Sequence, residues 1–217
     1  MKEVADNVWM LTVRANIVNL YVVGDVLIDA GMPWDGGWIL EQLRDRDIAA
    51  HAITHAHPDH MGSSNQICEQ LGIPFWVSEA DVPAAEDPGL MAADFVPLPR
   101  NPFSDVLMRV TSGPGRKVDL ALREGDEVDG FTVIHTPGHT RGHVSLWREA
   151  DRVLIVGDAL WNLPRLGAPF PLVNVDNDAV RQSIRRIAEL EPAVACFGHG
   201  SVLRDPGRLK QLASRLR

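Results

Sequence analysis

Three histidines and one aspartate stand within six residues of the chain, in the segment His55-Ala56-His57-Pro58-Asp59-His60. Imidazole and carboxylate groups together are ligands that Zn, Mn and Fe accept in proteins. A loop this short cannot wrap all of its side chains around one ion. His55 and His57 can face one metal while Asp59 and His60 face a second, so the spacing predicts half of a two-metal centre.

Three further residues of types that bind metals each follow an apolar segment that is predicted to form a strand. They are His139, Asp158 and His199, and a glycine precedes each of them, which lets the backbone approach closely. A carboxylate shared by two ions lowers their uncompensated charge, and Asp158 is the acid assigned to that bridge. The predicted ligands of one metal are His55, His57, His139 and Asp158, and those of the other are Asp59, His60, His199 and Asp158.

Strands and helices alternate around these residues, which favours mixed α/β layers. The predicted strands are 8–13, 19–23, 26–29, 49–54, 75–77, 118–122, 131–135, 144–147, 153–156 and 193–197. The predicted helices are 35–46, 61–71, 177–190 and 207–216, with Asp176 or Asp178 as the cap of the third.

The segment 82–118 breaks this pattern, because it holds six of the fifteen prolines and has no clean period. An irregular insertion of this length inside a domain is typical of a lid or binding loop, and the alternative is a surface excursion without a role. No linker rich in Pro, Gly or Ser divides the chain, so residues 1–217 are predicted to form a single domain.

Composition limits the classes of function. The net charge is −8 and no block of like charge occurs, which disfavours a nucleic-acid partner. The acidic start of the chain does not resemble a signal peptide, and no apolar stretch approaches the length of a membrane span, so a cytoplasmic protein with no membrane partner is expected. Cys68 and Cys196 have apolar neighbours and are predicted to be buried thiols.

In this order, the motifs HxHxDH, TPGHT, GD and GH resemble those of the metallo-β-lactamase-fold hydrolases, especially the glyoxalase II-like branch. The resemblance runs from about Asn19 to Gly200, and the segment 27–31 also matches an early strand motif whose Asp, here Asp29, supports the metal loop from behind. It implies an αββα four-layer sandwich with the metal site at the edge between the two sheets. It also implies the ligand assignment given above.

Two bridged divalent ions, zinc first and iron or manganese as alternatives, lower the pKa of a bridging water toward neutrality. The chain lacks a GxSxG elbow, so no serine nucleophile of that type competes with this chemistry. The sequence therefore predicts hydrolysis of a small ester, thioester or lactone by a metal-bridging hydroxide, with Asp59 as a catalytic residue that can also shuttle the proton. His143, four residues after His139, is predicted to orient a metal ligand.

The substrate pocket is expected between the insertion and the segment 161–175, where Trp161 is a wall residue. Lactonases that the chain resembles carry Tyr at the position of Trp161, and this chain does not. Arg165 can pair with a substrate carboxylate, or it is a solvated surface residue. Only seventeen residues follow Gly200, which disfavours the glutathione thioesters of glyoxalase II enzymes.

Two alternatives stay open at this point: a mononuclear iron enzyme similar to persulfide dioxygenases, and a metal-binding sensor without turnover. The expected partner is a small-molecule substrate. The sequence leaves the physiological substrate, the identity of the metal and the oligomeric state open.

Overall fold

Alternating burial along the strands divides the chain into stacked layers. The computed structural model describes residues 1–13, 17–93, 106 and 110–216. In one early strand, Leu20 and Val22 pack into one core while Tyr21 and Val23 pack into another. Successive side chains of a strand point to opposite faces, so a strand that is apolar on both faces must lie between two covering layers.

The first sheet has seven strands in the order β1-β2-β3-β4-β5-β6-β7, antiparallel from β1 to β4 and parallel from β4 to β7. Its strands are β1 (Lys2–Ala5), β2 (Val8–Val13), β3 (Val18–Val23), β4 (Val26–Ile28), β5 (Ala50–Ala52), β6 (Phe75–Ser78) and β7 (Leu120–Leu122).

The second sheet has five strands in the order β14-β11-β10-β9-β8, and only β11 and β14 are parallel neighbours. Its strands are β8 (Glu127–Val128), β9 (Phe131–His135), β10 (Val144–Arg148), β11 (Val153–Gly157) and β14 (Val194–Phe197). A small separate hairpin pairs β12 (Trp161–Asn162) with β13 (Leu166–Gly167).

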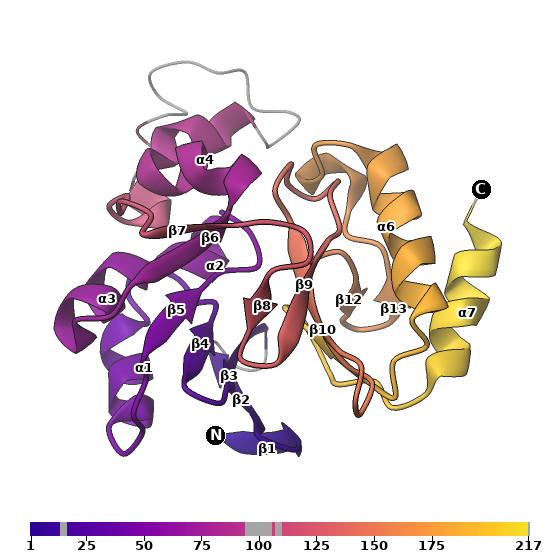
Figure 1. Ribbon diagram of the computed structural model, residues 1–217. Helices are drawn as coiled ribbons and strands as arrows, with labels where there is room; N and C mark the ends of the chain where they lie inside the picture. Colours follow the sequence, from indigo (N-terminus) through magenta and orange to yellow (C-terminus); the bar gives the residue numbers. More distant parts are fainter. Residues whose placement is uncertain (14–16, 94–105, 107–109, 217) are drawn as a thin grey trace.

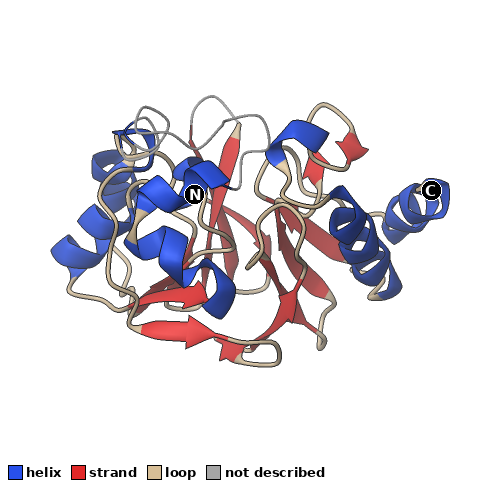
Figure 2. Cartoon of the chain, turned by 90° about the horizontal axis from the view of Figure 1, so that it is seen from above, coloured by secondary structure: helices blue, strands red, loops and turns tan. Residues whose placement is uncertain are grey.

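Helices cover the outer face of each sheet, so the order of layers is helix, sheet, sheet, helix (Figures 1 and 2). The helices on the side of the first sheet are α1 (Gly36–Leu43), α2 (Pro58–Met61), α3 (Ser64–Leu71) and α4 (Val82–Glu86), and those on the second are α6 (Asn177–Glu189) and α7 (Pro206–Arg215). Asp176 caps α6 by accepting from the backbone N–H of Asp178 and Ala179, which decides between the two predicted caps. The four-layer α/β sandwich expected from the sequence is confirmed.

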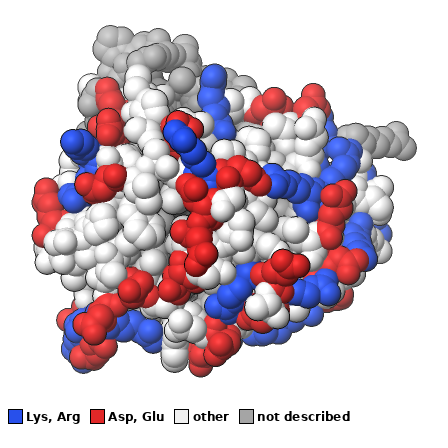
Figure 3. All heavy atoms as spheres, in the orientation of Figure 1, with Lys and Arg blue, Asp and Glu red and all other residues white. Residues whose placement is uncertain are grey.

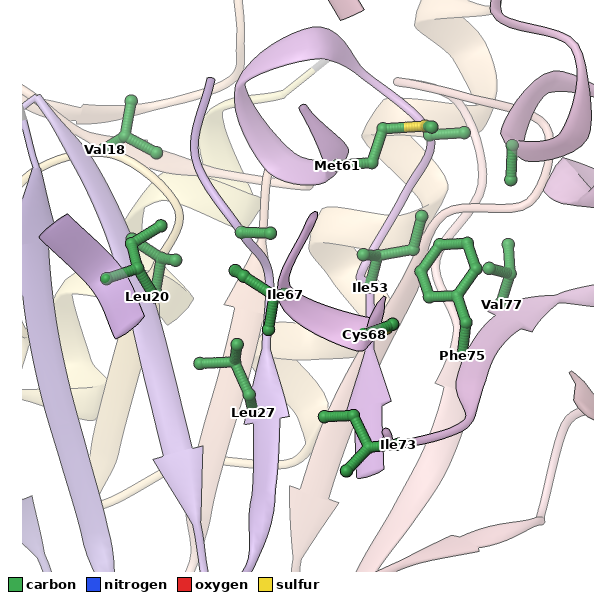
Figure 4. Close-up of a cluster of buried hydrophobic side chains, with 14 of the residues drawn as sticks. Val18, Leu20, Leu27, Ile53, Met61, Ile67, Cys68, Ile73, Phe75 and Val77 are labelled. Atoms are coloured by element: carbon green, nitrogen blue, oxygen red, sulfur yellow. The ribbon is translucent and has the colours of Figure 1, made fainter. Parts of the chain in front are cut away.

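Three apolar cores lie between these layers. Leu27, Ile67 and Phe75 belong to the core between the first sheet and its helices (Figure 4). Val133 and Ile155 belong to the core between the two sheets. The third core lies between the second sheet and helices α6 and α7. The amphipathic face predicted for α6 is buried in this third core.

Some local expectations need correction. The insertion is not irregular throughout, because α4 and a 3₁₀ turn over Pro88–Ala93 form its first part, with Pro83 in the first turn of α4 where a missing N–H costs nothing. Residues 94–105 and 107–109 of the insertion lie outside the described residues, so its role as a lid stays a prediction, as does the single-domain interpretation. The strand β1 was not expected from the sequence.

Both cysteines are buried and free, as predicted. Burial raises the pKa of Cys68 to about 11 and that of Cys196 to about 12, so neither is a thiolate near neutral pH. Within the described ranges, none of the helices has the length and apolar character needed to cross a membrane.

Candidate metal centre

The histidine-rich loop follows β5 at the carboxyl end of the parallel part of the first sheet. Pro58 occupies the first turn of α2, and His57 precedes it in an extended conformation, so the chain turns sharply inside the motif. His55 and His60 are fully buried, whereas the side chain of Asp59 keeps 30% of its surface exposed. The loop therefore holds its imidazoles inside the protein and leaves one carboxylate facing solvent.

The other three predicted ligands come from the second sheet. His139 follows β9, Asp158 follows β11 and His199 follows β14. β9 and β11 are both antiparallel to β10, and β14 is parallel to β11, so the carboxyl ends of these three strands meet at one edge of the sheet. That edge faces the histidine-rich loop, and all three side chains are buried there.

The structure brings all seven predicted ligands into one cluster. Their nitrogen and oxygen atoms form three groups in which every ligand atom lies within 4.8 Å of the others. These groups are His55 with His57 and His139, His55 with His60 and Asp158, and Asp59 with His60 and His199.

Asp158 occupies the middle of the cluster. Its Oδ2 lies 3.2 Å from Nε2 of His199 and 3.6 Å from Nε2 of His139, and its Oδ1 lies 3.6 Å from Nε2 of His60. The two carboxylate oxygens thus face different histidines of the cluster. The carboxylate thus lies within reach of histidines from both sheets.

The buried donor atoms of the cluster suit metal ions. Nε2 of His55, Nε2 of His60 and Oδ1 of Asp158 are buried and have no hydrogen-bond partner among the described residues. A buried polar atom without a partner costs free energy, and divalent cations accept these imidazole and carboxylate donors. The residues present therefore suit metal binding, although their role as ligands stays a prediction.

Hydrogen bonds behind the cluster orient the imidazoles. Nδ1 of His139 donates to Oδ1 of Asn174 at 2.9 Å, and Nδ1 of His199 donates to the backbone oxygen of Ile17 at 2.6 Å. Nδ1 of His60 donates to Asp29 at 2.9 Å. Because Nδ1 donates to these acceptors, Nε2 is the nitrogen of each ring that faces the cluster and that would bind a metal once it is deprotonated.

The charge states follow from burial and from the neighbours. Burial, joined by nearby histidines, holds the pKa of His55 and of His57 well below the ordinary value. Burial opposes ionisation of Asp158, but the neighbouring His199 and His60 overcome it and hold its pKa well below the usual range. At His60 and His199 the carboxylates of Asp59 and Asp158 outweigh burial and raise the pKa to about 9 and about 11, so a metal ion that binds these two rings would displace a proton from each.

Asp29 supports the loop from behind, at the position that the resemblance implied. Its Oδ1 accepts from the backbone N–H of Thr54 at 2.8 Å, and its other oxygen accepts from His60. His143 lies behind Asp158, where its Nε2 accepts from the backbone N–H of Asp158 at 2.8 Å and its Nδ1 donates to Thr136. Burial lowers the pKa of His143 to about 3, so the ring stays neutral and keeps this acceptor.

The sequence reasoning missed Asp81, which joins the two ligand-bearing loops. One of its carboxylate oxygens accepts from the backbone N–H of Ala56 at 3.0 Å and from the hydroxyl of Thr140 at 2.8 Å, and the other accepts from the backbone N–H of Gly142 at 2.7 Å. Asp81 follows β6 by three residues, so the rule that singled out acids after strands could have found it. Asn174, which orients His139, carries no comparable signal in the sequence.

The two predicted substrate residues lie in different places. Trp161 lines the metal-site pocket, of about 200 Å³, and its indole N–H donates to Oδ2 of Asp158 at 2.6 Å. Arg165 is not among the residues lining that pocket; it lines a separate one with Arg208 and Arg215. The metal-site pocket is lined by His57, Asp59, His139, Asp158, Trp161, Val173 and His199.

Comparison with known proteins agrees with this geometry. The model of the metallo-beta-lactamase superfamily matches residues 13–199, which include all seven predicted ligands. The chain belongs to this superfamily. A probable metallo-hydrolase of Bacillus subtilis, YflN, is 30% identical over 99% of this chain and 92% of its own length. The hydroxyacylglutathione hydrolase GloC of Haemophilus influenzae is 29% identical over 75% of this chain and 73% of its own.

Solved structures show the same metallo-beta-lactamase fold. A family protein of Thermus thermophilus matches with a TM-score of 0.75 and 26% identity, over 97% of this chain and 79% of that one. The protein TTHA1623, solved in a di-iron-bound form, matches with a TM-score of 0.66 and 27% identity over 94% and 98%. The chain is therefore a member of a superfamily of metallo-hydrolases, and its relatives include glyoxalase II-like proteins.

Proposed function

We propose that the protein is a dinuclear metal hydrolase of a small ester, thioester or lactone. The observation that carries the proposal is the central place of Asp158, whose two oxygens face histidines from both sheets. His55, His57 and His139 would hold one ion with Asp158, and Asp59, His60 and His199 would hold the other. Two divalent ions in such a site supply Lewis acidity and a water whose pKa is lowered toward neutrality.

The chain's own residues contribute position and proton handling. Asp59 is the partly exposed carboxylate of the cluster, and it lines the pocket. Although burial disfavours its charged form, His60 and His199 hold the pKa of Asp59 well below the usual range, so it is ionised and can hold a proton only transiently. The indole N–H of Trp161 holds one oxygen of Asp158 and leaves the other free to turn toward His60.

The pocket favours a small, weakly charged substrate. Its volume is about 200 Å³, and the described residues that line it include Trp161 and Val173 but no Lys or Arg. Phe170 packs against Trp161 with ring centroids 5.5 Å apart and stays largely exposed beside it. An apolar wall next to a cluster of imidazoles suits a short acyl group or a ring better than a peptide with several carboxylates.

The test combines metal quantification with a substrate panel. Purified protein is expected to hold about two divalent ions per chain and to hydrolyse short, neutral acyl esters, thioesters or lactones faster than acyl-glutathione. One iron per chain with oxygen uptake would contradict the proposal in favour of a dioxygenase. Full metal occupancy without turnover on the whole panel would contradict it in favour of a metal sensor.

A further inference from the structure

A second pocket, of about 220 Å³, lies between the tip of the β12–β13 hairpin and one face of α7. α7 packs beside β13, on the side of the molecule away from the first sheet (Figure 1). The pocket shares none of its lining residues with the metal-site pocket. It is lined by Arg165, Leu166, Arg208, Gln211, Leu212 and Arg215.

The spacing on α7 explains how these side chains meet. Arg208, Gln211 and Arg215 stand at intervals of three and four residues, which places them on one stripe of the helix. Arg165 lies between β12 and β13 and reaches the same pocket from the opposite side. Leu166 and Leu212 are partly buried against the third core and provide an apolar base. Three guanidinium groups from two elements therefore line one small pocket.

Among the described residues, these three arginines differ from several others in having no acidic partner. Within the described part of the chain, no carboxylate lies within ion-pair distance of Arg165, Arg208 or Arg215. By contrast, Arg181 on α6 pairs with Asp178, and several other arginines are also paired. The chain is acidic overall, with a net charge of −8, so a pocket whose described lining holds three cations and no acid is a local exception.

No acidic side chain is among the described residues that line the pocket. On the face of the protein drawn in Figure 3, by contrast, acidic and basic side chains lie beside one another. Three like charges that share a pocket repel one another, and a bound anion offsets that repulsion. The pocket is therefore a suitable place for an anion.

We propose that this pocket binds a phosphate group of a small molecule, at a site separate from the metal centre. A carboxylate has two oxygens and is satisfied by one guanidinium fork, whereas a phosphate offers oxygens to several forks at once. The amide of Gln211 adds a donor, and the apolar base formed by Leu166 and Leu212 can contact the carbon-bearing part of the ligand. The proposal does not depend on the activity of the metal centre.

The test is calorimetric titration of the metal-loaded protein with inorganic pyrophosphate and, in parallel, with malonate as a dicarboxylate. Pyrophosphate is expected to bind more tightly than malonate and to weaken as salt is added. Arg208→Ala and Arg215→Ala should each weaken binding about tenfold, the effect of losing one charged hydrogen-bonding partner. Arg208→Lys should recover only part of it, because it keeps the charge but loses the planar fork.

Arg181→Ala is the matched control, because it removes an arginine that is already paired and lies outside the pocket. Metal content and ester hydrolysis are measured on the same variants, so a failure of the proposed hydrolase activity is separated from a failure of anion binding. Equal binding of malonate and pyrophosphate would contradict the proposed phosphate site. So would pyrophosphate binding that survives Arg208→Ala combined with Arg215→Ala, since the anion would then be bound elsewhere, for example at the metals.

Discussion

The two sheets build their halves of the candidate metal centre in different ways. The first sheet contributes His55, His57, Asp59 and His60 from one short loop after a single strand. The second contributes one residue from each of three separate strand ends. The first half therefore depends on the conformation of one loop, whereas the second depends on the register of a whole sheet.

The difference predicts how each half responds to damage. On the side of the first sheet, the carboxylates of Asp29 and Asp81 hold the loop through backbone and side-chain hydrogen bonds. On the side of the second sheet each of these supports acts on one ligand, since His143 and Trp161 hold Asp158 and Asn174 holds His139. Loss of a support on the first side should disturb several ligands together, and loss of one of these supports on the second side should disturb mainly one ligand.

The largest effect is expected from Asp158→Ala, because this residue lies between the two halves. The variant should bind metal poorly at both positions and lose activity by about a thousandfold or more, since the loss of shared ligation removes several kcal/mol of transition-state stabilisation. Metal quantification and hydrolysis rates are measured together. Asp151→Ala, which removes an acid on the surface, is the control. A variant that kept both metals and its rate would refute the bridging role.

The next largest effect is expected from Asp81→Ala, because Asp81 supports both ligand-bearing loops although it is not itself a predicted metal ligand. It leaves the backbone N–H groups of Ala56 and Gly142 and the hydroxyl of Thr140 without their acceptor. Because these buried groups lose their partner, the free energy of unfolding should fall by about 3 kcal/mol in total. Metal affinity should fall as well, because both loops lose a support. Asp81→Asn should be milder because an amide oxygen can still accept. Chemical denaturation with metal titration measures both, and unchanged metal affinity in Asp81→Ala would restrict Asp81 to a role in stability.

The layers of the fold follow from the sequence because apolar period and turn residues are local properties. Val8–Val13 and Phe131–His135 form strands with the predicted ends, and α6 has its predicted apolar face and an aspartate cap. β1 and α4 were missed, because β1 is a short edge strand with two exposed residues and α4 spans only Val82–Glu86, with Pro83 in its first turn. Such short elements exist through tertiary contacts rather than through their own periodicity.

The candidate ligands could be found from sequence because each follows a strand and has an unusual residue type for its surroundings. The residues behind them could not be ranked the same way. Asn174 acts through a hydrogen bond that spans 35 residues, and its place in the chain carries no signal. Asp81 follows a strand, but its hydrogen-bond partners lie 25 to 61 residues away and are brought to it only by the fold. Arg165 shows the converse, since nearness in sequence to Trp161 suggested a shared pocket that the hairpin geometry does not form.

His51, a buried neutral histidine on β5, should make the free energy of unfolding depend on pH. Nδ1 of His51 donates to the backbone oxygen of Leu27, and Nε2 accepts from Ser64 on α3. Burial lowers the pKa of His51 to about 4, from 6.5 in the unfolded chain. The unfolded state then binds more protons, so stability is lost as pH falls from about 6.5 toward 4, by about 3 kcal/mol for this residue.

The comparison of wild type with His51→Gln isolates this contribution, since metal-dependent effects are common to both proteins. The free energy of unfolding of His51→Gln should be lower at pH 7 and should fall less steeply between pH 6.5 and 4. Parallel curves for the two proteins over that range would show that His51 is not the titrating group.

The smallest effect is expected on the second half, from Trp161→Phe. Phenylalanine keeps the aromatic contacts with His199 and Phe170 but removes the N–H that donates to Asp158. Loss of one hydrogen bond to a charged group costs about 1.5 kcal/mol, or about tenfold in kcat. Trp147→Phe, on β10 and away from the cluster, controls for the substitution itself. A fall in kcat with unchanged melting temperature and metal content would mark Trp161 as a positioning residue for Asp158. An equal fall in kcat in both variants would show that Trp161 acts only through packing. The support of Asp158 would then come from His143 alone.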